Sequence, residues 1–157
     1  MTDIGLRSTV EQADLIRRGE ISSRELTTHF IERIERLDDE INAVVTRDFE
    51  TALAESDAAD ARQQKGQSLG VLHGVPVTVK DALQTKNLKS TGGATELREN
   101  IPSQDAAAVA SIRREGAIVM GKTNLPRWSG DIQAYNDIFG TTNNPWDISR
   151  GPGGSSG

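Results

Sequence analysis

Two groups of residues in this chain have types and spacing that suit chemistry. The first is Lys80, which ends a valine-rich run and is followed at once by Asp81. The second is a pair of hydroxyls, Ser155 and Ser156, on the glycine-rich stretch 151–157. Glycines let the backbone around such hydroxyls approach a substrate closely. Taken alone, the stretch is equally typical of a flexible Gly/Ser tail.

The run before Lys80 has the alternation of a β-strand. Val75, Val77 and Val79 fall on one face, so Lys80 falls on the other face at the end of the strand. Strand ends of α/β sheets are common places for ligands. A lysine buried there would be available as a general base, whereas an exposed lysine would be a surface charge. The strand alone leaves both interpretations open.

A third pattern imitates a nucleotide site. Residues 116–123 match the phosphate-binding pattern G-x-x-x-x-G-K-[ST], with Lys122 at the lysine position. That motif requires its four middle residues to form a loop, but residues 117–120 are an apolar run typical of a buried strand. We therefore predict a strand here and no nucleotide site.

The rest of the chain predicts the elements that would position these residues. Capping-box patterns at Ser8 and Ser22 start two helices, and an Ala-rich helix is predicted over 49–64. A short strand is expected at 42–46, a plain turn at 90–94, and a helix over 104–115 before the buried strand. Strand, helix and strand in this order indicate an α/β fold with a partly parallel sheet. The residues expected on the apolar faces of the first two helices are Val10, Ala13, Leu15, Ile16, Leu26, Phe30, Ile34, Leu37 and Ile41.

Composition excludes several classes of protein. There is no cysteine, and His29 and His73 are the two histidines, so we expect no disulfide and no metal site built from cysteine or histidine. No cofactor is expected. The net charge of −5, with the acidic excess in the first 70 residues, argues against nucleic-acid binding. No segment is apolar enough for a membrane span, and the start lacks the features of a secretory signal. A cytoplasmic setting is expected.

Several motifs in order resemble the amidase signature family. GVPVTVKD at 74–81 is similar to the family pattern G-[IV]-P-[IV]-x-[IVL]-K-[DE], and GKTN at 121–124 to G-K-[TL]-N. NPW at 144–146 and PGGSSG at 152–157 are similar to N-P-W…P-G-G-S-S-G-G. The resemblance implies the N-terminal portion of the amidase signature fold, with a mixed central sheet flanked by helices.

The same resemblance implies a domain organisation. Residues 70–157 carry it densely and would form the first part of the α/β core. Residues 1–69 are compatible with the helical region that packs on that core.

The resemblance also implies a Ser–Ser–Lys triad that hydrolyses amide bonds through an acyl-enzyme. Lys80 would be the general base, and Ser155, held in a cis peptide, would relay the proton between Lys80 and the nucleophile. Three neighbours would support this loop: Gly153, Gly154 and Ser156. Ser129 and Asp131 lie in the segment that corresponds to a family loop near the acyl-binding pocket, so they are expected substrate contacts.

The resemblance implies that one feature of the family is to be expected beyond residue 157. The nucleophilic serine of the family follows the relay serine in a D-x-G-G-S-type segment, which also forms the oxyanion hole. Because no acyl-enzyme forms without the nucleophile, we expect residues 1–157 alone to be inactive. The remainder would belong to the same protein or form a separate chain, and the full-length protein could be a homodimer.

Three functions compete at this point. The first is a general amidase acting on small carboxamides, favoured by the segment 127–131, which resembles free-standing amidases. The second is the amidase subunit of a glutamyl-tRNA amidotransferase, which hydrolyses glutamine and passes ammonia to a partner. The third is a non-catalytic module that binds a partner through exposed apolar surface.

Overall fold

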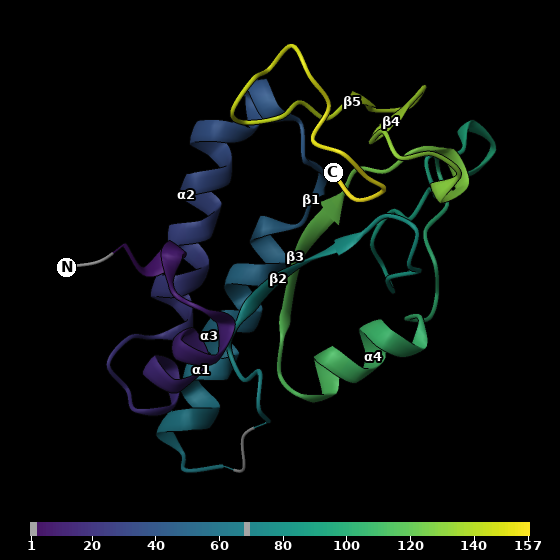
Figure 1. Cartoon of the computed structure of the whole chain (residues 1–157). Coiled ribbons are helices and arrows are strands. Elements are labelled where there is room, and N and C mark those ends of the chain that lie inside the picture. Colours follow the sequence, from purple (N-terminus) through teal and green to yellow (C-terminus); the bar gives the residue numbers. More distant parts are fainter. Residues whose placement is uncertain (1–2, 68–69) are drawn as a thin grey trace. The chain divides into compact units, whose positions relative to one another are not determined.

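The computed structural model of the protein describes residues 3–67 and 70–157 (Figure 1). These residues form two compact units that interleave along the sequence. The first unit takes in the described residues of 1–33, 48–77 and 110–120, and the second those of 34–47, 78–109 and 121–157. The domain boundary predicted between residues 69 and 70 adjoins Ser68 and Leu69, which lie outside the described residues, and it stays a prediction.

Both predicted capping boxes begin helices. Helix α1 covers Thr9–Arg17, and the Ser8 hydroxyl accepts from Glu11 N at 3.3 Å while the Glu11 carboxylate accepts from Ser8 N at 2.8 Å. Helix α2 covers Ser23–Ile41, where Ser22 and Glu25 exchange the same pair of bonds at 3.0 and 2.8 Å. Each box satisfies donors that a helix start leaves without partners.

A third helix helps to fix the start of α2. Helix α3, Phe49–Gln64, has the predicted bounds and contributes Asp60. The two carboxylate oxygens of Asp60 accept from Ser23 N at 2.7 Å and Arg24 N at 3.1 Å. A carboxylate at a helix N-terminus also interacts favourably with the helix dipole. The core of this unit contains Ala13, Ile16, Leu26 and Val75.

The predicted core face of α2 is wrong at Leu37, which is 40% exposed. The neighbouring position, Asp38, is buried instead. Its carboxylate accepts from Ala43 N at 2.8 Å and Val44 N at 3.1 Å, and pairs with Arg47 at 3.1 Å. The end of α2 therefore faces inward with a carboxylate that caps the following turn, and the leucine beside it turns outward.

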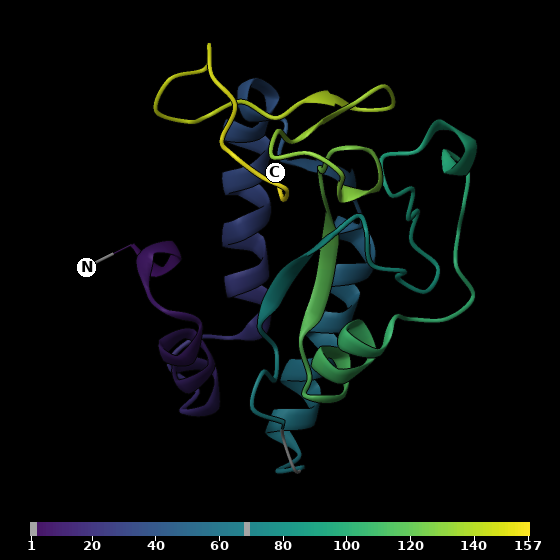
Figure 2. The same ribbon diagram turned by 45° about the vertical axis from the view of Figure 1, so that its right-hand side comes forward.

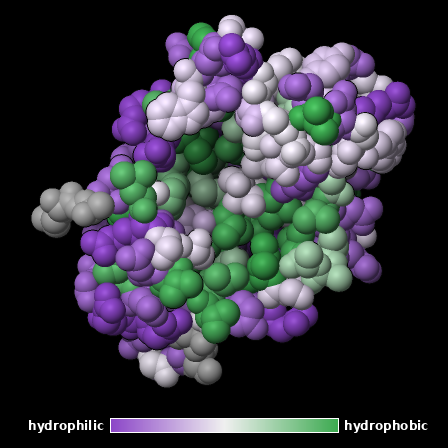
Figure 3. Space-filling model, viewed as in Figure 1, coloured by the Kyte–Doolittle hydropathy of each residue, from purple (hydrophilic) through white to green (hydrophobic). Residues whose placement is uncertain are grey.

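Val10 is also exposed rather than part of the core, at 71%. Together with Val71, which is 64% exposed, it lines an apolar pocket of about 290 Å³ in the first unit. Hydrophobic side chains are visible at the surface in the space-filling view (Figure 3). Exposed apolar residues at the margin of a small core are common in folded proteins.

The sheet has three strands, β1 (Val44–Arg47), β2 (Pro76–Lys80) and β3 (Ile118–Thr123), in the order β1-β3-β2 (labelled in Figure 1). Strand β1 is antiparallel to β3. Strand β2 runs parallel to β3. Hydrogen bonds join Val75 to Ile118 at the start of the two strands and Asp81 to Thr123 at their ends, so the residue numbers increase in the same direction along both. Helix α4 (Ala107–Arg114) lies between β2 and β3 in the sequence. The mixed α/β sheet is as predicted.

Shorter elements complete the fold. They are the 3₁₀ turns Ile4–Leu6, Thr95–Leu97 and Arg127–Ser129 and the antiparallel pair β4 (Tyr135–Asn136) and β5 (Gly140–Thr141). The glycine-rich stretch 151–157 has no helix or strand. Among residues 3–67 and 70–157, no helix has the length and apolar character needed to cross a membrane.

The capping contact of Asp60 generates a stability prediction. Replacing Asp60 with Ala should lower the free energy of unfolding by about 1–2 kcal/mol, because two N–H groups at the start of α2 lose their acceptor. Urea denaturation of the chain measures the change. Asp57→Ala is the matched control, since Asp57 forms an exposed ion pair with Arg24, and a loss of comparable size there would contradict the account.

Candidate active site

Lys80 and Ser155 meet at the end of β2. Lys80 is the last residue of the strand and is half-buried, on the face opposite the buried Val79. Its Nζ donates a hydrogen bond to Ser155 Oγ, and the Gly154–Ser155 peptide is cis. In Figures 1 and 2 the C-terminal end of the chain lies beside the end of β3. The fold therefore joins an amine and a hydroxyl that are 75 residues apart.

The loop that carries Ser155 lies in close contact with its surroundings at two glycines. Gly157 N donates to Asn124 O at 2.8 Å, and a Cβ at Gly157 would lie 2.5 Å from Thr142 Oγ1. A Cβ at Gly154 would overlap the carbonyl of Ile132. Gly153 has a φ of +96°, which favours glycine. The pattern of glycines is thus explained by close approach and backbone geometry.

Asn124 connects this loop with the end of β3 and is fully buried. Its Oδ1 accepts from Leu125 N at 3.0 Å and Asn136 Nδ2 at 2.7 Å. Its Nδ2 donates to Gly140 O and Thr142 Oγ1, each at 3.1 Å. All four hydrogen-bonding positions of the amide are used. In the sequence Asn124 is only the last letter of a motif, and nothing local indicates this role.

The other predicted site residues lie at the surface. Ser156 is exposed, and Asp131 is exposed with Oδ1 accepting from Ile132 N at 2.6 Å. Ser129 and Trp128 have φ values of +57° and +54°, an uncommon geometry for residues with side chains. In the described part of the chain, no hydrogen bond joins Ser129 or Asp131 to Lys80 or Ser155. Their role as substrate contacts stays a prediction.

Ser129 and Trp128 do line a pocket of about 240 Å³ within the second unit. Trp128 N donates to Gly92 O at 2.8 Å, which holds the turn against the 90–94 loop. The pocket also has polar walls from Asp81, Ser90 and Asn100. It is a concave surface with both polar and apolar walls beside the segment that the family resemblance associates with the substrate.

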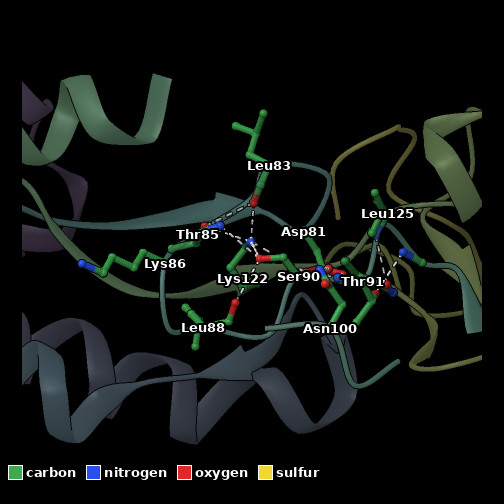
Figure 4. Close-up of polar contacts among 12 residues, drawn as sticks. Asp81, Leu83, Thr85, Lys86, Leu88, Ser90, Thr91, Asn100, Lys122 and Leu125 are labelled. Carbon is green, nitrogen blue, oxygen red and sulfur yellow. Dashed lines mark hydrogen bonds and ion pairs between the residues drawn. The ribbon is translucent and has the colours of Figure 1, made fainter. Parts of the chain in front are cut away.

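Lys122 occupies a fully buried polar cluster rather than a phosphate loop (Figure 4). It lies in β3, as the apolar run before it predicted. Its Nζ donates to Leu83 O at 2.6 Å, Ser90 Oγ at 2.8 Å and Thr85 Oγ1 at 3.0 Å. An ammonium has three N–H donors. All three are used, so none is left for a nucleotide phosphate.

Asp81 is the charge partner of Lys122 in this cluster, with Oδ1 3.8 Å from Nζ. Both carboxylate oxygens accept from Thr91 N at 3.1 Å, and the Thr91 hydroxyl donates as well. Burial raises the pKa of Asp81 and lowers the pKa of Lys122 to about 8, while their ion pair opposes both shifts.

The 90–94 loop is therefore more than the plain turn that we predicted. Ser90 and Thr91 are buried because they supply hydrogen bonds to the Asp81–Lys122 pair. Small hydroxyl residues are typical of exposed turns, and the sequence carries no signal for a buried charge pair nearby. Here the need to satisfy that pair decides the structure of the loop.

Comparison with known proteins adds independent information. A glutamyl-tRNA(Gln) amidotransferase subunit of Salinispora arenicola (strain CNS-205) is 42% identical over 157 residues, which are 100% of this chain and 32% of that protein. A bacterial aryl acylamidase of the amidase signature family superposes with a TM-score of 0.89 and 30% identity over 96% of this chain and 31% of that one. Peptide amidase from Stenotrophomonas maltophilia superposes with a TM-score of 0.88 and 31% sequence identity, over 96% of this chain and 32% of that one.

These matches cover nearly all of this chain but only part of each relative. The chain spans about a third of the length of the relatives that it matches. Residues 25–157 match the Amidase family. On this match, with the fold shared with solved amidase signature enzymes, the chain belongs to the amidase signature family.

Proposed function

We propose that the full-length protein containing this chain hydrolyses carboxylic acid amides at the C–N bond, with Lys80 as general base and Ser155 as proton relay. The observation that carries the proposal is the hydrogen bond from Lys80 Nζ to Ser155 Oγ. The proteins of similar structure include an aryl acylamidase and a peptide amidase, whose names describe the same class of reaction.

In the proposed mechanism, neutral Lys80 accepts the proton of Ser155 Oγ while Ser155 accepts the proton of the nucleophilic hydroxyl. The nucleophile attacks the amide carbonyl and forms a tetrahedral intermediate. The proton returns through Ser155 to the leaving nitrogen as the C–N bond breaks, which leaves an acyl-enzyme. Water then attacks the acyl-enzyme by the reverse relay and releases the carboxylic acid.

Other parts of the site have supporting roles in this proposal. The D-x-G-G-S-type segment expected beyond residue 157 supplies the nucleophile and the oxyanion hole, and the inactivity of residues 1–157 alone stays a prediction. Ser156, Gly153 and Gly154 shape the relay loop. Ser129 and Asp131 contact the substrate from the turn that follows Trp128. We also propose that the substrate is a small-molecule amide, that the protein is cytoplasmic and that the full-length protein is a homodimer.

A second candidate function is glutamine hydrolysis in an amidotransferase. The relatives at 42% identity are named as subunits of glutamyl-tRNA(Gln) amidotransferase, which favours this candidate. The same relay would then release ammonia from glutamine, and a partner protein would receive it. The two candidates share the C–N bond chemistry and differ in the acyl group and in the need for a partner.

Ammonia release from the full-length protein separates the two candidates. For the first, we expect hydrolysis of small aliphatic and aryl carboxamides by the purified protein alone, at rates well above those with glutamine. Preference for glutamine, with stimulation by a co-purified partner, would favour the amidotransferase instead. If the protein hydrolyses neither small carboxamides nor glutamine, the result contradicts the proposed function.

The role of Lys80 predicts the effect of Lys80→Met in the full-length protein. We expect kcat/KM to fall by about 10²–10⁴-fold, because a methionine has no amine to accept the proton. Steady-state amide hydrolysis measures the loss. Lys86→Met is the control, since Lys86 is an exposed lysine shortly after the same strand. Retention of activity in Lys80→Met would remove Lys80 from the mechanism.

The close contact of the relay loop predicts the effect of Gly154→Ala. The added methyl would overlap the Ile132 carbonyl and move Ser155, so we expect kcat to fall about 10²-fold. Gly66→Ala is the matched control, because Gly66 has a positive φ of +64° but has no atom within 4 Å of an added Cβ. Equal losses of activity in the two variants would show that the overlap does not matter.

A further inference from the structure

The turn after Lys80 is held from its interior by one side chain. Lys80 O accepts from Leu83 N at 3.0 Å, which closes the turn over residues 80–83. Lys122 Nζ then binds this turn at two points. It donates to the Leu83 carbonyl at 2.6 Å and lies 3.8 Å from the Asp81 carboxylate. The ammonium of Lys122 is therefore bound to the second and the fourth residue of the turn.

Main-chain bonds restrain the same turn from two sides. Asp81 N donates to Thr123 O at 3.0 Å, and Gly92 N donates to Asp81 O at 3.1 Å. The first bond links the turn to the residue that follows Lys122 in β3. The second links it to the loop whose Ser90 hydroxyl also accepts from Lys122. The turn, the strand and the loop thus share a single buried ammonium.

Lys122 is separate from the Lys80–Ser155 contact. Lys80 ends β2 and its Nζ contacts Ser155 Oγ, whereas the next residue, Asp81, lies against Lys122. Lys122 is fully buried and its three donors are used by Leu83, Thr85 and Ser90. Among the described residues, no hydrogen bond joins Lys122 to Lys80 or Ser155, so the turn is the connection between them that we consider.

We propose that Lys122 is a positioning residue for amide hydrolysis, which holds the 80–83 turn so that Lys80 Nζ remains against Ser155 Oγ. This inference rests on the proposed function of Lys80 and Ser155. It also gives a role to the lysine of the phosphate-loop pattern, whose donors are all used within the protein. Misplacement of a catalytic group by about 1 Å can cost about 10²-fold in rate, so a loosened turn has a measurable effect.

A double variant that removes both charges distinguishes the positioning role of Lys122 from its role as the charge partner of Asp81. Lys122→Met alone would leave the Asp81 carboxylate buried without its partner and would threaten folding. Asp81→Asn with Lys122→Met removes both charges, but the Leu83 carbonyl still loses its donor. Lys89→Met with Glu99→Gln is the matched control, since it removes an exposed ion pair of 2.9 Å in the same unit.

In the full-length protein we expect the double variant to fold, with kcat lowered about 10- to 100-fold and KM within about twofold of the wild type. We also expect faster hydrogen exchange at the Leu83 amide, because its bond to Lys80 O opens more often. The control pair should change neither quantity. Wild-type kcat in the double variant, or an equal rise of KM, would overturn the proposal.

Two further outcomes keep this inference separate from the proposed function. If the wild type hydrolyses no amide, the proposed function fails, and unchanged Leu83 exchange would overturn the positioning role by itself. If the double variant does not fold, Ser90→Ala removes one acceptor of Lys122 and keeps both charges. We then expect a few-fold loss in kcat at constant KM, and an unchanged kcat in that variant would overturn the proposal.

Discussion

The buried ion pair of Asp81 and Lys122 is the constraint on which the end of the sheet depends. A charge taken out of water is costly unless it is paired and hydrogen-bonded, so the surrounding chain must supply partners. Thr85, Ser90, Thr91 and the Leu83 carbonyl do so. These hydrogen bonds tie the turn after β2 and the loop at residues 90–91 to the ion pair.

Lys80 and Asp81, at the end of β2, contact different parts of the second unit. Lys80 contacts Ser155 in the loop 151–157, and Asp81 contacts the polar cluster around Lys122. The parallel partner β3 supports both sides, because it contributes Lys122 and leads directly into Asn124. Lys122 donates to the Leu83 carbonyl in the turn after Lys80, and the Asn124 carbonyl accepts from Gly157 N in the loop 151–157. A buried ion pair by itself adds little net stability, and we propose that this one fixes the geometry of the turn after Lys80.

Local patterns predicted much of this fold because their causes are local. The capping boxes at Ser8 and Ser22, the valine alternation before Lys80 and the apolar run before Lys122 each act over a few residues. The apolar run before Lys122 alone was enough to predict a strand in place of a phosphate-binding loop. The outward position of Leu37 was not predicted, because it depends on a cap that Asp38 gives to the following turn.

The site was predictable only through resemblance and only in part. Lys80 and Ser155 were paired by motif order, and the structure places them in contact, while their chemical roles remain proposals. The buried loop at Ser90 and Thr91 and the network of Asn124 were missed. Both depend on partners distant in the sequence, and polar residues of these types give the same local pattern when they are exposed.

A double-mutant cycle on Lys80 and Ser155 tests the central claim most directly. The rate of acyl-enzyme formation would be measured in the full-length protein for Lys80→Met, Ser155→Ala and the combination. If the two residues form one relay, removing the second after the first costs little more, so the double variant should match the slower single variant within a few-fold. Losses that multiply across the two substitutions would show that Lys80 and Ser155 act independently, and would contradict the account.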